Sequence, residues 1–440
     1  MNDKENKIYK PRPISGFPEW LPEYRIVEQH WMDKIRAVFE SYGFCNIETS
    51  SAEEIDVLTA KSGETENEIY TLARLQADED DKKDARLALR YDLTVPMARY
   101  VAQHFGQLVF PFKRYQMQKV WRGERPQKGR YREFYQCDID VVGVDDIPLH
   151  FDAELPAVLY QAYQALDIPP VTIHISNRKV VTGYLQGLGV TDVGFVTRTL
   201  DKLDKIRKDG VMKTLTDGGL TAALAEKCLA IVEIKSTDAS FADKVRALGV
   251  SNDQLTEGLN ELTFVMNNLK HLPTDAVVAV LDIIRGLDYY TGTVLEVRFR
   301  DGNGPSIGGG GRYDNLAGSF INQKLPGIGV SIGLTRLFGL LLVKGLIAPG
   351  PKSPAQILVV LPDEVRRAEA AATAHTLRQK GYNVEMYHRD AKVKNQIAYA
   401  EKKGIPFVWF PPFKDGQPHE IKNMKNGEQI QADPATWVIS

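Results

Sequence analysis

Cysteine is scarce in this sequence: its 440 residues include three, Cys45, Cys137 and Cys228, which lie far apart along the chain. This spacing argues against a disulfide framework and against a paired-cysteine metal site. The eight histidines show no HExxH spacing, so no structural zinc site is indicated. No apolar run reaches the length of a membrane span, and the N-terminal residues MNDKENKIYKPRP lack the apolar centre of a signal peptide. We expect a cytoplasmic protein without membrane contacts.

A strong charge of either sign is also lacking. The formal net charge of −2 excludes a basic chain that coats nucleic acid nonspecifically. It leaves room for a local phosphate site, and the segment WRGERPQKGRYREF carries Arg122, Arg125, Lys128, Arg130 and Arg132. No glycine run is followed by Lys and then Ser or Thr, and no GxGxxG motif opens a βαβ unit. The sequence therefore argues against P-loop and dinucleotide-binding proteins.

The chain length predicts two or three domains. Apolar residues recur with a helical period over 23–42, and Gly43 follows as a C-terminal cap. Short β-rich runs come next, at 69–72 and 87–91. Two further runs, 114–121 and 134–142, alternate in side-chain character around a polar, glycine-containing loop, which predicts a long antiparallel hairpin.

The rest of the chain separates into segments of different character. Residues 179–270 are charged and largely helical in pattern, which indicates an inserted helical domain. Strand patterns resume at 276–284 and 293–299, and a glycine-rich turn precedes a buried helix over 331–338. A Pro- and Gly-rich linker follows at 347–354. Beyond it, strand patterns at 357–361, 383–387 and 406–410 alternate with helices at 363–380 and 394–403, which predicts a small α/β domain with a largely parallel sheet.

Three arginines lie in apolar or strand-like contexts, where an unpaired charge is expensive: Arg122, Arg285 in RGLDYYTGT and Arg336 in GIGVSIGLTRL. A buried ion pair explains any one of them. Three together suit a polyphosphate better than three unrelated salt bridges. Phe134, at the far end of the basic loop, offers an aromatic face on which a base can stack.

Carboxylates gather in another part of the same region, at Asp92, Asp138 and Asp140. Because side chains alternate along a strand, Gln136, Asp138 and Asp140 share one face. A strand edge that faces water explains any one aspartate, but the apolar continuation at 141–143 favours burial. Such a cluster is suited to a cation such as an ammonium group or a protonated imidazole. The separate run Gly308–Gly311 permits a close backbone approach to a ligand or to a neighbouring strand.

These motifs resemble those of class II aminoacyl-tRNA synthetases, and specifically those of the histidyl-tRNA synthetase family. RGERPQKGRYREF is similar to the motif 2 loop of the class and GVSIGLTRL to its motif 3. RGLDYYTGT and GGGGRYD are similar to two signatures peculiar to the histidine-specific family, and LRYDLTVPMARY resembles its amino-acid-binding strand. The resemblance covers nearly the whole chain.

The resemblance implies an α+β fold, in which helices flank an antiparallel sheet. It implies a catalytic core over 1–179 and 271–345, a helical insertion domain over 180–270, a linker over 346–354 and an α/β anticodon-binding domain over 355–440. The implied assembly is a homodimer. The implied reaction joins L-histidine to ATP with Mg²⁺, giving histidyl-adenylate and pyrophosphate, and then esterifies the terminal adenosine of tRNA(His) with release of AMP.

Site residues follow from the same resemblance. Arg122 and Arg285 are the implied catalytic residues, placed on opposite sides of the α-phosphate. The implied ATP-binding set is Arg122, Glu124, Arg130, Phe134 and Arg336: Phe134 stacks on adenine with Glu124 near its amino group, and Arg336 grips the γ-phosphate. The implied histidine-binding set is Asp92, Thr94, Gln136, Asp140, Arg285, Tyr289 and Tyr290. Of these, Asp92, Thr94 and Gln136 bind the α-amino group, whereas Asp140 and Tyr290 read the imidazole. No protein ligand for a metal is implied.

Two alternatives stay open at this point. A catalytically inactive relative, such as the synthetase-like regulatory subunit of ATP phosphoribosyltransferase, shares the core but typically lacks RGLDYY-like residues and the anticodon domain. A general ATP-dependent ligase without tRNA is disfavoured by the α/β domain after the linker. A pyrophosphate exchange assay across all twenty amino acids separates these possibilities.

Overall fold

The computed structural model describes residues 9–60, 67–75, 86–127, 129–283, 290–302 and 304–439. The chain divides into two compact units, and the second consists of Glu19–Trp31 together with Ala348–Ser440. The N-terminal stretch groups with this second unit, where the Gly350 N–H donates to the Glu23 carbonyl at 2.8 Å. The domain boundaries given by the sequence analysis stay a prediction.

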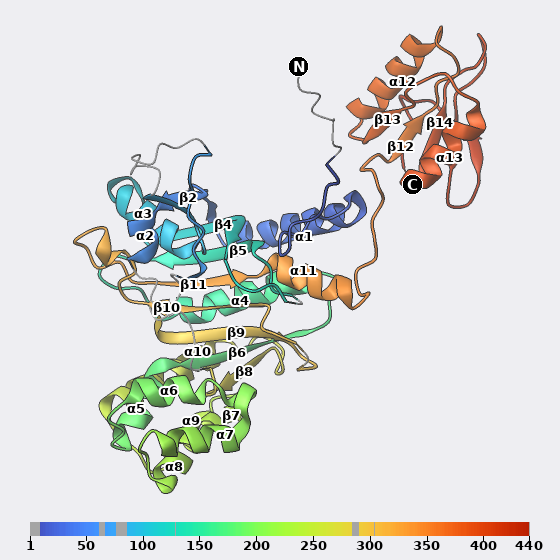
Figure 1. Ribbon diagram of the computed structural model, residues 1–440. Helices are drawn as coiled ribbons and strands as arrows, with labels where there is room; N and C mark the ends of the chain where they lie inside the picture. The colour runs from blue at the N-terminus through green and yellow to red at the C-terminus, as the bar shows by residue number, and fades with distance from the viewer. Residues whose placement is uncertain are drawn as a thin grey trace. The chain divides into compact units, whose positions relative to one another are not determined.

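A nine-stranded sheet is the centre of the first unit (Figure 1). In spatial order its strands are β1 (Cys45–Asn46), β4 (Phe112–Trp121), β5 (Glu133–Val142), β11 (Gly327–Ile332), β10 (Gly308–Tyr313), β9 (Tyr290–Phe299), β6 (Val171–Asn177), β8 (Val277–Val280) and β7 (Lys235–Ser236). The pairs β1–β4 and β6–β8 are parallel, and the other neighbours are antiparallel. The expected antiparallel sheet flanked by helices is therefore confirmed, with two parallel pairs added.

Several local predictions are confirmed. Helix α1 covers Pro22–Ser41, and Gly43 has the positive φ of 79° that a helix-ending glycine provides. Strands β4 and β5 pair without interruption from Phe112↔Val142 to Trp121↔Glu133. This hairpin brings Arg122, just after β4, and Phe134, near the start of β5, to the same end of the sheet.

Other local predictions are wrong. The glycine-rich stretch before residue 331 is not a turn, because Gly308–Gly311 lie in the interior strand β10 and Gly327 and Gly329 lie in β11. The missing side chains of Gly308–Gly311 let β9 and β11 approach from both sides. A Cβ atom on Gly310 would lie 2.0 Å from the Gly329 carbonyl oxygen. The expected helix over 331–338 begins later, as α11 (Leu334–Val343), because Ser331 and Ile332 end strand β11. Residues 69–72 form a bridge at Thr71↔Ala88 in place of a strand.

Helices pack on the sheet, and a group of further helices lies between β6 and β8 in the chain. Helix α4 (Phe151–Gln164) packs on β11 and β6, and α11 packs on β5. Short elements β2 (Ala52–Glu54), α2 (Ile55–Thr59), β3 (Leu87–Leu89) and α3 (Thr94–Gln103) complete this part. The expected helical region contains α5 (Arg178–Gly187), α6 (Val193–Leu200), α7 (Leu203–Asp217), α8 (Ala222–Val232), α9 (Phe241–Arg246) and α10 (Asp253–Asn268). Side chains of Asn177, Asp192, Thr221 and Asn252 cap the first turns of four of these helices.

The C-terminal part of the second unit is built on a five-stranded sheet in the order β13 (Val384–Met386), β12 (Ile357–Val359), β14 (Phe407–Phe410), β15 (Glu420–Asn423) and β16 (Gln429–Gln431). Helices α12 (Arg367–Gln379) and α13 (Val393–Lys403) connect the parallel strands. The predicted parallel α/β arrangement holds for β13, β12 and β14, and an antiparallel extension follows them. Within the described parts of the chain, no helix is long and apolar enough to cross a membrane.

Candidate active site

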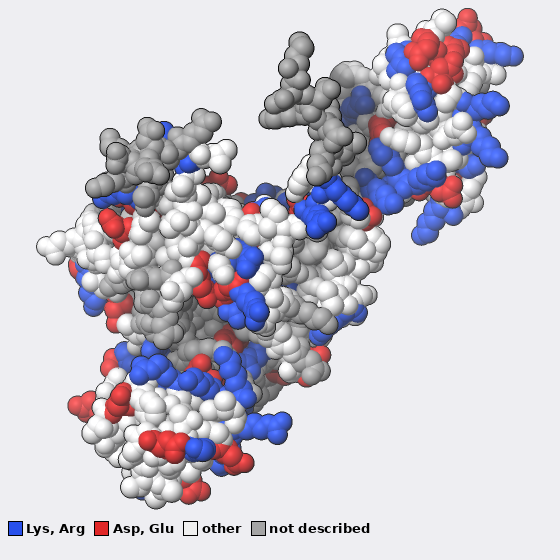
Figure 2. All heavy atoms as spheres, in the orientation of Figure 1, with Lys and Arg blue, Asp and Glu red and all other residues white. Residues whose placement is uncertain are grey.

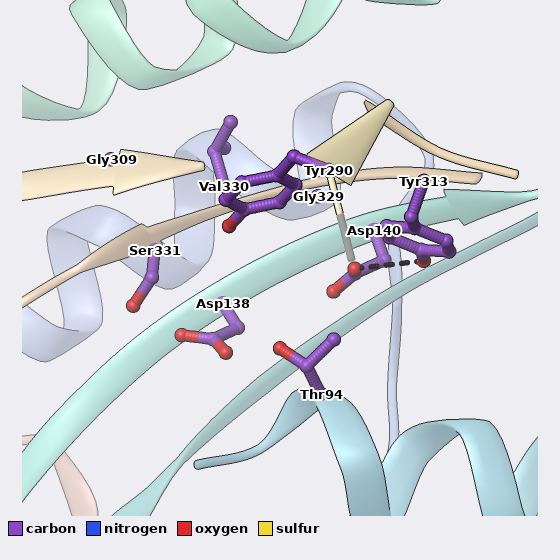
Figure 3. A pocket seen from close by; sticks show the side chains of 9 residues that line it. All are labelled: Thr94, Asp138, Asp140, Tyr290, Gly309, Tyr313, Gly329, Val330 and Ser331. Carbon is purple, nitrogen blue, oxygen red and sulfur yellow. Dashed lines mark hydrogen bonds between the residues drawn. The ribbon is translucent and has the colours of Figure 1, made fainter. Parts of the chain in front are cut away.

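Two adjoining hollows lie on one face of the large sheet. The larger cavity has a volume of about 700 Å³ and is lined by residues of β5, β9, β10 and β11, together with the loop after β4 and the first residues of α3 and α11. A smaller pocket, which we call the acidic pocket, is lined by Thr94, Asp138, Asp140, Tyr290, Gly309, Tyr313, Gly329, Val330 and Ser331. Figure 3 shows the carboxylates of Asp138 and Asp140 and the hydroxyl of Thr94 directed into this pocket. The two hollows adjoin, because both are lined by Thr94, Asp138, Tyr290, Gly309 and Ser331.

Asp140 is held from two sides at the end of the acidic pocket. Its Oδ2 lies 2.5 Å from the guanidinium of Arg114, which is directly opposite on β4, and its Oδ1 accepts a hydrogen bond of 3.1 Å from the Tyr313 hydroxyl. Arg114 is fully buried. Burial raises the pKa of Asp140, while Arg114 and Tyr313 oppose that rise. The carboxylate is thereby fixed in position for a ligand beside Tyr290.

Asp92 and Asp138 are buried carboxyl groups of the same region. Burial raises the pKa of Asp92 to about 6, although the backbone N–H of Val95 donates to its Oδ1 at 3.1 Å. Burial also raises the pKa of Asp138 to about 7, with Asp140 adding to the rise and Arg114 opposing it. Three buried carboxyl groups thus lie near two buried guanidinium groups, those of Arg114 and Arg90. Carboxyl groups outnumber guanidinium groups there, so the region is suited to receive further positive charge.

The other end of the large cavity is basic and aromatic. The guanidinium carbon of Arg122 lies 5.2 Å from the centre of the Phe134 ring, and its Nε donates to the Tyr91 carbonyl at 3.0 Å. Glu124 and Arg130 form a two-point ion pair within the same wall. That pairing fixes both side chains of the loop on the cavity wall.

Arg336 extends from the first turn of α11 into the cavity. Its Nε donates to the Gly129 carbonyl at 2.9 Å and its Nη1 to the Ser306 carbonyl at 3.1 Å. Burial lowers the pKa of Arg336, and repulsion from Arg122 adds to this effect. Neutral carbonyl groups hold the guanidinium in place without cancelling its charge, which leaves it able to bind an anionic ligand.

Glycines make room where the strands meet the acidic pocket. A Cβ atom on Gly329 would lie 1.9 Å from Oδ1 of Asp140, and one on Gly311 would lie 2.9 Å from the ring of Tyr290. Side chains at these positions would therefore displace the groups that line the pocket. The close backbone approach predicted from the glycine run is confirmed.

The structure brings together most of the residues that the sequence analysis selected. Those lining the large cavity are Asp92, Thr94, Arg122, Glu124, Arg130, Phe134, Gln136, Tyr290 and Arg336, and Asp140 lines the acidic pocket. Arg285 and Tyr289 lie outside the described residues. Arg114 and Tyr313 were not selected. Tyr313 belongs to the quoted GGGGRYD motif. Arg114 is a charged residue within a predicted strand, and in the structure it lies opposite Asp140.

A largely antiparallel sheet that carries an arginine-lined cavity beside an acidic pocket is the arrangement that the resemblance to class II aminoacyl-tRNA synthetases predicts. The family model described as histidyl-tRNA synthetase matches residues 16–337, and that described as anticodon binding domain matches residues 356–435. The chain belongs to the histidyl-tRNA synthetase family.

Relatives support this assignment over nearly the full length. The chain is 58% identical to a histidine–tRNA ligase of Thermobifida fusca (strain YX), over 98% of this chain and 99% of that protein. It is similar to the crystal structure of histidyl-tRNA synthetase from Nostoc sp. PCC 7120, with a TM-score of 0.87, 36% identity and 97% of each chain covered. An ATP phosphoribosyltransferase regulatory subunit/histidyl-tRNA synthetase from Bacillus halodurans C has a TM-score of 0.74 at 20% identity, covering 89% of this chain and 97% of that one. This last likeness shows a shared fold alone.

Proposed function

We propose that the acidic pocket binds histidine and that the large cavity binds ATP, in a chain that charges tRNA with histidine as its family does. The observation that supports this assignment of the two substrates is the separation of charge across the two adjoining hollows. Three buried carboxyl groups lie at one end, and Arg122, Arg130 and Arg336 lie along the other. An amino acid with a positive α-ammonium group and a nucleotide with negative phosphates match these two ends.

Histidine recognition is divided between two groups of side chains. Asp92, Thr94 and Gln136 bind the α-amino group, and Asp140 and Tyr290 bind the imidazole. A carboxylate and a phenol suit the two ring nitrogens, since a neutral imidazole has one N–H donor and one acceptor. Arg285 and Tyr289 complete the histidine-binding set.

ATP binding uses the basic end. Phe134 stacks on adenine with Glu124 near its amino group, and Arg122 and Arg130 bind phosphate. Arg336 holds the γ-phosphate. The histidine carboxylate then attacks the α-phosphorus, an acyl–O–P bond forms, and the bond to the β-phosphate oxygen breaks to release pyrophosphate. Arg122 and Arg285 neutralise the charge that develops on the α-phosphate, so no nucleophilic side chain is needed.

Mg²⁺ fits this site as a partner of the phosphates. Mg²⁺ typically takes one or two carboxylates plus substrate phosphates and water, not an all-protein cage. Among the described residues no group of three or more His, Cys, Asp or Glu side chains is placed to hold a metal, whereas Glu296 lines the cavity near Arg336. Glu296, whose Oε2 is ion-paired with Arg298 at 2.9 Å, is the carboxylate of the cavity that would hold the ion, which supplies charge neutralisation on the phosphates when bound.

The C-terminal domain contacts the anticodon of tRNA(His), and the chain works as a cytoplasmic homodimer. The family match over residues 356–435 supports the first part. Figure 2 shows many Lys and Arg side chains on the visible face of this region. Lys392, Lys394 and Lys402 are exposed, which suits contact with phosphates, whereas Lys403 is already paired with Glu385 at 2.8 Å.

ATP–pyrophosphate exchange across the twenty amino acids tests the proposal. We expect exchange with histidine alone, followed by charging of tRNA(His) when tRNA is added. A regulatory protein of synthetase-like fold would give no exchange, and a ligase of other specificity would exchange with another amino acid. Either result contradicts the proposed function.

A further inference from the structure

Three buried oxygen atoms at the junction of the two hollows accept no hydrogen bond from the part of the chain that the structure describes. They are Oδ2 of Asp92, Oε1 of Gln136 and Oδ1 of Asp138. All three residues line the large cavity, and Asp138 also lines the acidic pocket. A buried acceptor without a donor costs free energy, so three in one cavity indicate a ligand with several donors. An ammonium group has three N–H donors and one positive charge.

The other carboxylate oxygen of Asp92 and both of those of Asp140 already have partners within the protein, and Asp140 is assigned to the imidazole and not to the amine. Asp140 uses Oδ1 for Tyr313 and Oδ2 for Arg114. Asp92 uses Oδ1 for the Val95 N–H. The amide nitrogen of Gln136 donates to Ser331 at 2.8 Å, which fixes the orientation of its oxygen. Asp138 therefore supplies a charged acceptor that the histidine-binding set, as given above, leaves out.

We propose that Asp138 is a further histidine-binding residue, that its Oδ1 receives the α-ammonium group together with Asp92 and Gln136, and that histidine binding releases the proton of its carboxyl group to solvent. This inference rests on the proposed function, since it assigns the substrate amine of the same site. It adds a carboxylate that binds the substrate amine and a coupling between histidine binding and pH.

The charges around Asp138 explain why its proton responds to the ligand. The titratable or charged groups that face it are Arg90 and Asp92 from the segment before α3, Arg114 from β4, Asp140 from β5, Tyr290 from β9 and Tyr313 from β10. Strand β11 contributes the uncharged Ser331, which hydrogen bonds to the carboxyl group. Burial with two neighbouring carboxylates raises the pKa of Asp138 to about 7, so the protonated form of this carboxyl group is present in the free protein near neutral pH. A bound ammonium group favours the ionised form and drives that proton off.

The test is a thermodynamic cycle in which the carboxylate of Asp138 is removed from the protein and the α-amino group is removed from the ligand, separately and together. Binding of L-histidine and of 3-(imidazol-4-yl)propanoate, which lacks the α-amino group, is measured by titration calorimetry for the wild type and for Asp138→Asn. We expect the substitution to weaken histidine binding on the order of 10-fold or more, as for a lost charged hydrogen bond. Binding of the propanoate should change by no more than about 2-fold, because the amine that contacts Asp138 is absent. An equal loss for both ligands overturns the proposal.

Proton release is a second measurement that needs no variant. Repeating the wild-type titrations at pH 7 in buffers of different ionisation enthalpy counts the protons exchanged. We expect histidine to release more protons than the propanoate does, because burial raises the pKa of Asp138 in the free protein to about 7 and a bound ammonium group favours the ionised form. Equal proton counts for the two ligands contradict the proposal even if Asp138→Asn does not fold. Histidine-dependent exchange by the wild type shows separately whether the proposed function holds.

Discussion

Replacing Asp140 with asparagine removes one negative charge from the acidic pocket and keeps the size of the side chain. In the wild type, Oδ2 of Asp140 lies 2.5 Å from Arg114, a fully buried cation, and Oδ1 binds the Tyr313 hydroxyl. The variant leaves Arg114 without this partner. Breaking a buried ion pair costs about 3–5 kcal/mol of unfolding free energy, and we expect the low end because Asp138 and Asp92 remain near.

The same change should weaken histidine recognition more than ATP binding. Loss of a hydrogen bond to a charged group costs about 1.5–3 kcal/mol, which is roughly a 10- to 150-fold rise in the KM for histidine. The KM for ATP should change little, because Asp140 lines the acidic pocket and not the basic end of the cavity. ATP–pyrophosphate exchange at 25 °C, with each substrate varied in turn, measures both constants.

Asp152→Asn is a matched control for the loss of stability. Asp152 is fully buried on α4 and pairs with Arg312 at 2.6 Å, but it lines neither hollow. We expect a comparable fall in the free energy of unfolding and an unchanged KM for histidine at 25 °C. If Asp140→Asn leaves the KM for histidine unchanged, or if Asp152→Asn raises it equally, the assignment of Asp140 to imidazole recognition is refuted.

Three further predictions follow from local contacts. Arg336→Ala should lower adenylate formation on the order of 10²-fold in pyrophosphate exchange, with partial recovery in Arg336→Lys, because a point charge cannot reproduce the guanidinium fork; full activity in the alanine variant would contradict this role. Gly310→Ala places a Cβ atom 2.0 Å from a backbone oxygen of β11, so Tm should fall by several degrees or more, whereas Gly106→Ala, whose Cβ meets nothing within 4 Å, should leave Tm unchanged. His419 accepts a hydrogen bond from Trp409 Nε1 at 3.1 Å and burial lowers its pKa, so the neutral ring is favoured in the folded state. Its contribution to stability is present above the unfolded pKa of about 6.5 and is lost as pH falls below it. Tm measurements between about pH 8 and 5 should show this loss in the wild type, and the His419→Gln variant should lack it.

The elements that the sequence predicts well are those with strong local periodicity. The hairpin of β4 and β5 follows from alternation in side-chain character over residues 114–121 and 134–142, and α1 follows from an apolar stripe and a glycine after its last turn. Strands β15 and β16 were not predicted, because they are short and polar: the β16 residues, Gln429–Gln431, are all exposed. The sequence of such a strand does not differ from that of a loop, and pairing decides the structure: β15 pairs with β14, and β16 pairs with β15.

Site residues that lie in local motifs can be predicted from the sequence, whereas a site residue that depends on tertiary pairing cannot. Arg122, Phe134 and Arg336 carry local motifs, and the structure places them on one cavity. Arg114 carries no motif of its own. Its importance depends on pairing with Asp140 across two strands, in a register set by the whole hairpin. A buried charge that is paired through tertiary structure is not visible from the residues on either side of it.

The motif GGGGRYD shows why one segment contains residues of opposite kinds. On β10, Gly308 and Arg312 face α4, where Arg312 pairs with Asp152 and a Cβ atom on Gly308 would lie 2.5 Å from the Tyr163 hydroxyl. Alternation turns Gly311 and Tyr313 to the other face, where Gly311 leaves room for Tyr290 and Tyr313 binds Asp140. Each face therefore combines glycine for close packing with one polar side chain that orients a carboxylate. A one-residue shift in register would turn Arg312 towards the pocket and Tyr313 towards α4, so both contacts would be lost.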